Sequence, residues 1–181
     1  MLIILGGLPG SGKSTIARAL ARELDAVHIR IDSIEQALRE SGLTAPMNDS
    51  GYRVGYAIAE DNLKIGRIVI ADSVNPWPVT RDAWLAVSRA AAVHAIEVEI
   101  VCSDHQEHRR RVDTRTSDIA GLRLPTWQEV VERDYRPWPR ATVVIDTARG
   151  TIQEQLSALR AALVSAGARE ESSRSLRIRE S

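Results

Sequence analysis

The feature that most constrains this chain is the run GLPGSGKS at residues 7–14, which fits the phosphate-binding loop pattern G-x-x-x-x-G-K-[ST] at every position. An apolar run, residues 2–5, precedes the loop, and a segment with helical spacing, residues 14–21, follows it. Strand, glycine loop and helix in this order are the context that separates the motif from a chance match. The order predicts backbone amides that point inward at phosphate oxygens, beside the positive end of a helix.

Two side chains of this loop have predicted roles of their own. We expect Lys13 to place a mobile cation near the β- and γ-phosphates and Ser14 to offer its hydroxyl to Mg²⁺. Lys13 and Lys64 are the only lysines in a chain that otherwise uses arginine, so a compact ammonium is kept where a planar guanidinium would not serve. A glycine turn without a ligand is the alternative. The predicted nucleotide-binding residues of the loop are Gly7, Leu8, Pro9, Gly10, Ser11, Gly12, Lys13, Ser14 and Thr15.

Size and charge limit the class of protein. A chain of 181 residues suits one domain with a good core. The formal net charge is +0, so no global field attracts nucleic acid or an anionic membrane. The first strand occupies the N-terminus, which leaves no room for a signal peptide, and no apolar run approaches membrane-spanning length. We therefore expect a cytoplasmic protein without a membrane partner; its oligomeric state is left open.

Apolar runs alternate with helical segments, the pattern of an α/β protein with a parallel sheet covered by helices on both faces. The predicted strands are residues 2–5, 27–31, 68–71, 96–101 and 142–145. The predicted helices are residues 14–24, 33–39, 52–65, 81–93, 105–114, 127–133 and 152–164. We expect a loop at 41–49, a mobile flap at 115–125, one domain over 1–166, and a disordered charged tail at 167–181.

Two carboxylates follow predicted strands, at the edge of a parallel sheet where ligands bind. Asp32 comes directly after the second strand and could accept a proton from an attacking hydroxyl or help to organise Mg²⁺. The alternative for Asp32 is an N-cap of the next helix. Asp72 ends the apolar strand at 68–71 in the Walker B form, which binds Mg²⁺ directly or through water.

Arginines could supply further positive charge to a transferring phosphoryl group. Arg111 and Arg115 share one helix face at i, i+4 spacing, and Arg115 begins the flap, so it would reach the site when the flap closes. Asp113 and Asp118 could instead pair with the arginines of this stretch, among them Arg109, Arg111 and Arg115, on the surface. Arg149, in the loop after the fifth strand, is predicted to stack on an adenine ring.

The helices that flank the third strand could form the pocket of a second substrate. Arg53 and Arg81 are candidates for binding an anion, and aromatic residues such as Tyr52 lie nearby in the sequence. Asn75, close to Trp77 in a short loop, could form a wall beside the transferred phosphate; a rigid turn is the alternative.

In these residues the chain resembles the small P-loop kinases related to zeta toxins, chloramphenicol phosphotransferase, gluconate kinase and the kinase module of polynucleotide kinase. The resemblance rests on five stretches that span the chain nearly to residue 148. They are GLPGSGKST, Asp32 after the second strand, VIADSVNPWPVTR, RRVDTRTS with LPTW, and YRPW with VVIDTA.

The resemblance implies the three-layer P-loop NTPase fold with a five-stranded parallel sheet and a short lid, and it implies ATP and Mg²⁺ as ligands. By position it makes Asp32 the general base, Arg115 the lid arginine, and Lys13 and Ser14 the phosphate and metal ligands. Polynucleotide kinase-type members often carry arginine three residues after the base, where this chain has Glu35. We therefore expect a kinase that phosphorylates a hydroxyl of a small molecule. A polynucleotide 5′-hydroxyl kinase and a non-kinase regulatory ATPase are the alternatives.

Overall fold

A computed structural model describes residues 1–42, 48–141 and 143–179, with side chains through Ser165. The loop predicted at 41–49 falls mainly on residues 43–47, which lie outside the described residues. Residue 142, the predicted start of the last strand, and residues 180–181 of the predicted tail also lie outside them.

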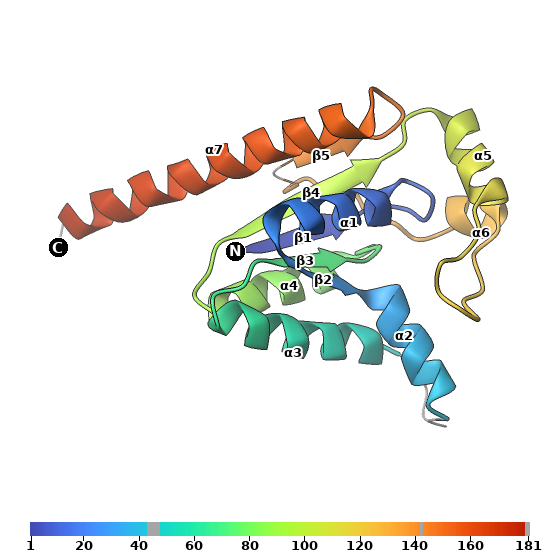
Figure 1. The fold of residues 1–181 in the computed structure, drawn as a ribbon, viewed down its shortest axis with the longest axis horizontal. Helices are drawn as coiled ribbons and strands as arrows, with labels where there is room; N and C mark the ends of the chain where they lie inside the picture. Colours follow the sequence, from blue (N-terminus) through green and yellow to red (C-terminus); the bar gives the residue numbers. More distant parts are fainter. Residues whose placement is uncertain (43–47, 142, 180–181) are drawn as a thin grey trace.

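Five parallel strands form one sheet in the order β2-β3-β1-β4-β5 (Figure 1). The strands are β1 Leu2–Gly6, β2 Val27–Arg30, β3 Val69–Asp72, β4 Ala95–Val101 and β5 Val143–Asp146. All five residues of β1 are buried, as its uninterrupted apolar sequence requires of a strand in the centre of a covered sheet. The predicted α/β class and the five-stranded parallel sheet are confirmed.

Helices cover the sheet on both faces, which gives the three layers of the P-loop NTPase fold (Figure 1). Alternate residues of a strand point to opposite faces. Accordingly, Ile3 and Leu5 belong to the core under α1 and α7, whereas Leu2 and Ile4 belong to the core under α3 and α4. These four helices are α1 Lys13–Leu24, α3 Ser50–Lys64, α4 Pro78–Ala90 and α7 Ile152–Arg179.

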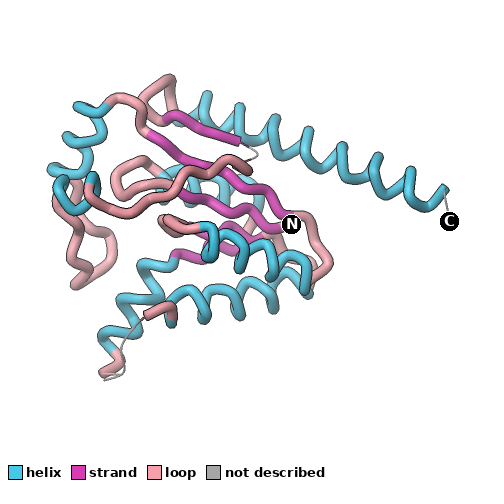
Figure 2. The backbone as a smooth tube through the Cα atoms, turned by 180° about the vertical axis from the view of Figure 1, so that it is seen from behind, coloured by secondary structure: helices cyan, strands magenta, loops and turns pink. Residues whose placement is uncertain are grey.

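Three further helices, together with loops, surround the carboxyl ends of the strands (Figure 2). They are α2 Ile31–Glu40, α5 His105–Thr114 and α6 Trp127–Val131. The side chain of Asp104 caps α5 by accepting from the amides of residues 106 and 107. Thr126 and Glu129 form a capping box at the start of α6. The capping box fixes the end of the predicted flap, which lies between α5 and α6.

The last helix is longer than its sequence pattern predicts. Helical periodicity predicts residues 152–164, but α7 runs to Arg179, through most of the segment where disorder is expected, and extends past the sheet (Figure 1). Alanine, arginine, glutamate and leucine have high helix propensity and no proline interrupts this stretch, so its composition favours a helix even without apolar periodicity. Among the described residues, no helix is both long enough and apolar enough to span a membrane.

Candidate active site

The loop between β1 and α1 has a backbone shape that requires glycine. Gly7, Gly10 and Gly12 have φ angles of 142°, 84° and 96°, in the region that side chains rarely adopt. A Cβ atom on Gly10 would also lie 2.5 Å from Cγ2 of Val112 in α5. The loop therefore curls tightly beneath α5, and α1 begins directly after Gly12.

The donors of this loop are available for an anion. In the described residues, the backbone amides of Gly10, Gly12, Lys13 and Ser14 donate to no protein acceptor. The ammonium of Lys13 is buried and donates to the carbonyl of Leu8 at 3.0 Å. Burial lowers the pKa of Lys13, while the charges of two nearby aspartates oppose that shift. Free amides beside a buried ammonium and a helix N-terminus fit the phosphates of a nucleotide.

Asp72 ends β3, opposite Leu5 of β1, and is buried. Burial alone would raise the pKa of this carboxyl. A hydrogen bond from His28, the charge of Lys13 and a hydrogen bond from Ser14 nevertheless hold the pKa of Asp72 below its ordinary value. A carboxylate that stays ionised beside a serine hydroxyl is the donor set that Mg²⁺ prefers, so the residues present fit this ion.

His28 is a residue of the site that sequence reasoning missed. It lies on β2, and its Nε2 atom is 3.1 Å from Oδ2 of Asp72 on β3. The contact exists because β2 and β3 are neighbours in the sheet although they are about 40 residues apart in the chain. The strand order would have revealed it, but the order cannot be read from a single sequence.

Asp32 lies in the first turn of α2, exposed and lining the cleft. The N-cap of α2 is Arg30 and the helix begins at Ile31, so the alternative role of Asp32 as a cap is wrong. The negative charge of Asp32 acts on both Lys13 and Arg115. An exposed carboxylate that faces the phosphate loop and the flap can be reached by a second substrate.

Arg115 follows the last residue of α5 and opens the predicted flap. It is half-buried, and its Nε and Nη2 atoms have no hydrogen-bond partner among the described residues. Burial lowers the pKa of Arg115, although Asp32 opposes the shift. Of the predicted surface pairs, one forms: Asp113 binds Arg109 at 3.4 Å. Asp118 instead binds Arg18 and Arg30, the latter at 2.8 Å. The ion pairs of Asp118 tie the flap to α1 and β2.

The two other predicted nucleotide-binding arginines have different surroundings. Arg111 lines the cleft and donates from Nη1 to Oγ1 of Thr147 at 2.8 Å, which fixes it near the end of β5. The side chain of Arg149 is 81% exposed, pairs with Asp146 at 3.0 Å and does not line the cleft. The structure therefore brings Arg111 to the site but leaves Arg149 outside it.

Three residues predicted to bind the second substrate do not line the cleft. Arg53 is exposed on α3. Asn75 is fully buried and donates from Nδ2 to the carbonyl of Leu5 at 2.8 Å, so it serves the turn that was the alternative reading. Arg81 is 1% exposed, and its guanidinium donates to four backbone carbonyls, those of Asn75, Pro76, Arg136 and Pro137. Sequence proximity to β3 does not say which way a side chain points, so it did not predict that these three side chains lie outside the cleft lining.

The cleft has a volume of about 600 Å³ and lies between the phosphate loop, α2, the flap and the loop after β3. Side chains that sequence reasoning did not assign to it are Arg39, Ser73 and Arg133. Arg133 is the last residue of the helix predicted at 127–133, and helical spacing alone did not direct it to the site. The lining of the cleft also includes Tyr52, Trp77 and Glu35.

The parallel sheet, the glycine loop and the buried Lys13 define a P-loop nucleotide-binding protein. Residues 2–137 match the family model AAA_33, described as an AAA domain, and the chain belongs to this family. The predicted P-loop class of protein is confirmed, and small P-loop kinases are among the solved structures that share its fold. No match was found among the curated proteins.

Solved structures share this fold over nearly their whole length. An APS kinase, CysC of Mycobacterium tuberculosis in complex with AMPPNP and APS, is 19% identical with a TM-score of 0.65, covering 90% of this chain and 96% of that chain. A gluconokinase from Sinorhizobium meliloti 1021 is 22% identical with a TM-score of 0.62, covering 94% and 96%. Chaetomium thermophilum Kti12 in complex with ADP-AlF3 is 21% identical with a TM-score of 0.65, covering 90% and 98%. At these identities the likeness concerns the fold.

Proposed function

We propose that this chain is an ATP-dependent kinase that transfers the γ-phosphoryl group to a hydroxyl of a small-molecule acceptor. One observation carries the proposal: a single cleft brings together the exposed carboxylate of Asp32, the buried ammonium of Lys13 and the half-buried, unpartnered guanidinium of Arg115. A base, a phosphate ligand and a mobile cation are the parts that phosphoryl transfer needs.

The nucleotide is held by the free amides of the loop and by Lys13, which exchanges the carbonyl of Leu8 for phosphate oxygens. Ser14 and Asp72 hold Mg²⁺, through bonds that are direct or pass through water. When bound, this ion neutralises negative charge on the β- and γ-phosphates. His28 keeps the carboxylate of Asp72 ionised and oriented toward the loop.

Asp32 accepts the proton of the acceptor hydroxyl while the hydroxyl oxygen forms its bond to the γ-phosphorus. The bond from that phosphorus to the bridging oxygen breaks, and the oxygen leaves on ADP. Arg115 stabilises the charge that spreads over the transferring group, and the flap excludes water that would otherwise attack in place of the acceptor.

The size of the cleft supports a small acceptor. A volume of about 600 Å³ must hold the triphosphate as well as the acceptor, and the flap with Asp118 closes one side of it. The similar proteins described as an APS kinase and a gluconokinase carry names of kinases for small compounds, which supports the same reading for this chain.

The proposal is tested by measuring ATP consumption with a panel of sugar acids, nucleosides, aminoglycosides and simple alcohols, followed by mass spectrometry of the products. We expect one class to gain a single phosphoryl group. Asp32→Asn should lower kcat by about 100-fold or more while the affinity for ATP changes little, since general base catalysis contributes about 10²–10⁴. Asp61→Asn, a matched change at an exposed residue of α3, should have no effect.

ATP hydrolysis at the same rate with and without every acceptor would refute the proposal and favour the regulatory ATPase. A single-stranded oligonucleotide belongs in the panel as well, because label from γ-labelled ATP in that oligonucleotide would favour the polynucleotide kinase.

A further inference from the structure

Most of the positive charge around the cleft is already neutralised. Asp118 pairs with the two arginines of α1 and β2 described above. Arg39 pairs with Glu35 at 3.2 Å, and Arg123 pairs with Glu129 at 2.7 Å. These side chains hold one another in place and are poorly suited to attract a further anion.

Three cations of the cleft have no acidic partner among the residues that the structure describes: Lys13, Arg115 and Arg133. Lys13 and Arg115 are accounted for by the triphosphate and by the transferring phosphoryl group. The guanidinium of Arg133, just after α6, has neither a hydrogen bond nor an ion pair to any described residue, although Glu35 lines the same cleft. Its charge is unused in the mechanism above.

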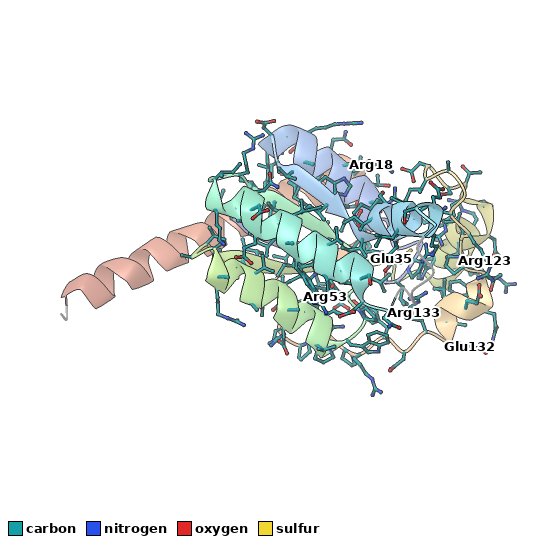
Figure 3. All side chains as sticks on the ribbon, turned by 90° about the horizontal axis from the view of Figure 1, so that it is seen from below. Arg18, Glu35, Arg53, Arg123, Glu132 and Arg133 are labelled. Atoms are coloured by element: carbon teal, nitrogen blue, oxygen red, sulfur yellow. The ribbon has the colours of Figure 1, made fainter. Side chains whose placement is uncertain are left out.

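The position of Arg133 relates it to the acceptor. It lines the cleft with Glu35 of α2 and Tyr52 of α3, and its charge acts on both Glu35 and Lys13. Figure 3 shows Arg133 and Glu35 at the same end of the molecule, close to the α6 side chains. Arg111, in contrast, is bonded to Thr147 after β5. Arg133 therefore shares its part of the cleft with side chains of α2 and α3, the elements beside Asp32.

We propose that Arg133 binds an anionic group of the acceptor, so that the substrate is an alcohol carrying a carboxylate, phosphate or sulfate. The inference rests on the proposed kinase function. The guanidinium presents a planar fork of donors that matches the oxygens of each of these groups. Glu35 does not neutralise this site, because Arg39 already holds its carboxylate. Asp32 receives the hydroxyl proton, and Arg133 determines which alcohols are retained.

The first experiment needs no turnover. The full chain is saturated with Mg²⁺ and a non-hydrolysable ATP analogue, which fills the phosphate loop, and sodium sulfate is titrated against sodium chloride at equal ionic strength. Thermal unfolding is recorded for the wild type, Arg133→Ala and Arg22→Ala. Arg22 is an exposed arginine of α1 outside the cleft, so its removal matches the change in charge. Sulfate stabilises folded proteins in general, so the difference between variants is the measurement.

We expect the wild type and Arg22→Ala to show an added, saturable rise of Tm with sulfate, and Arg133→Ala to lack it. An equal response of all three proteins would overturn the proposal. A loss of affinity for the ATP analogue of more than about 10-fold in Arg133→Ala would also overturn the proposal, because Arg133 would then bind the nucleotide. The threshold of about 10-fold corresponds to the loss of one charge-assisted hydrogen bond.

The second experiment uses matched acceptors that differ in an anionic group: gluconate with sorbitol, and glycerate with glycerol. We expect the anionic member of a pair to be preferred. Arg133→Ala should lower its kcat/KM by about 10- to 100-fold and leave the neutral member within about threefold, as for the loss of a hydrogen bond to a charged group. Equal losses for both members would overturn the proposal. If no acceptor is phosphorylated, the kinase function fails, and the sulfate titration still decides whether Arg133 is an anion site.

Discussion

Arg81 is the residue for which the prediction made from the sequence and the structure disagree most. The sequence predicts a ligand of the acceptor, whereas the structure buries the guanidinium against four backbone carbonyls, with its Cζ atom 4.7 Å from the centre of the Trp138 ring. These contacts fasten residues 136–138, which follow α6, to the loop after β3. Arg81 should therefore stabilise the fold by holding residues 136–138 against the loop after β3.

The expected size of the effect follows from the two hydrogen bonds that are wholly buried, to Asn75 at 2.9 Å and to Pro76 at 3.3 Å. A hydrogen bond to a charged group contributes about 1.5–3 kcal/mol, so losing both costs about 3–6 kcal/mol. Replacement by methionine keeps the apolar stem, which makes Arg81→Met the informative variant. The loss is a large part of a total stability of about 5–15 kcal/mol.

The assay is unfolding in urea, monitored by circular dichroism, for the wild type, Arg81→Met, Arg81→Lys and Arg53→Ala. The side chain of Arg53 is exposed and has no hydrogen bond or ion pair to the described residues, so its removal should change stability by less than about 0.5 kcal/mol. Arg81→Lys keeps the charge but loses the fork and should fall between the extremes; it remains informative if the methionine variant does not fold. Unchanged stability of Arg81→Met together with a raised KM for the acceptor would refute the structural role.

Three further predictions concern the site. Arg115→Ala should lower kcat by about 10²–10³-fold with a small change in the KM for ATP, as for removal of a donor that acts in the transition state. Steady-state kinetics measures both constants, and unchanged activity would mean that Arg115 is a surface residue without a catalytic role. The pKa of Asp72 is depressed in the folded state, so its carboxylate stabilises the fold above the unfolded pKa near 3.8, and the stability is lost as pH falls through the folded pKa. Asp72→Asn should therefore be less stable at pH 7 by about 1–3 kcal/mol, and the difference from the wild type in urea unfolding should shrink below about pH 4; a constant difference across pH would contradict the pKa shift. Asp118→Asn removes two exposed ion pairs worth about 0–1 kcal/mol each, so the global free energy of unfolding should hardly change. Amide hydrogen exchange at residues 115–125 should accelerate, because the flap loses its ties to α1 and β2. Unchanged exchange at these residues would show that the ion pairs do not restrain the flap.

The elements that depend on local sequence were predictable. β1 is continuously apolar and the glycine loop has fixed spacing, so both were found within a residue or two of their observed bounds. The order of elements also predicted the parallel sheet, because each strand is followed by a helix. α7 exceeded its prediction because a helix can continue on propensity alone, without the apolar positions that define periodicity.

The phosphate side of the site was predictable and the acceptor side was not. Gly10, Lys13 and Ser14 lie in one continuous motif. Arg39 and Arg133 reach the cleft, and His28 reaches Asp72, from separate elements whose neighbours are set by tertiary packing. Arg81 illustrates the opposite error, since an arginine near the right strand end was buried with its donors satisfied by backbone carbonyls. A charged residue close to a site in sequence says little until the direction of its side chain is known.

The lengths of the outer strands have a consequence for self-association. β2 and β5 form the two margins of the sheet, and each contains four residues. A margin this short offers few unpaired amides and carbonyls on which a strand of another molecule could extend the sheet. The exposed side chain of Val144 on β5 adds an apolar group at this margin. A strand of four residues nevertheless offers few backbone groups with which another strand could pair. This architecture protects a parallel sheet, which folds slowly, against edge-to-edge aggregation.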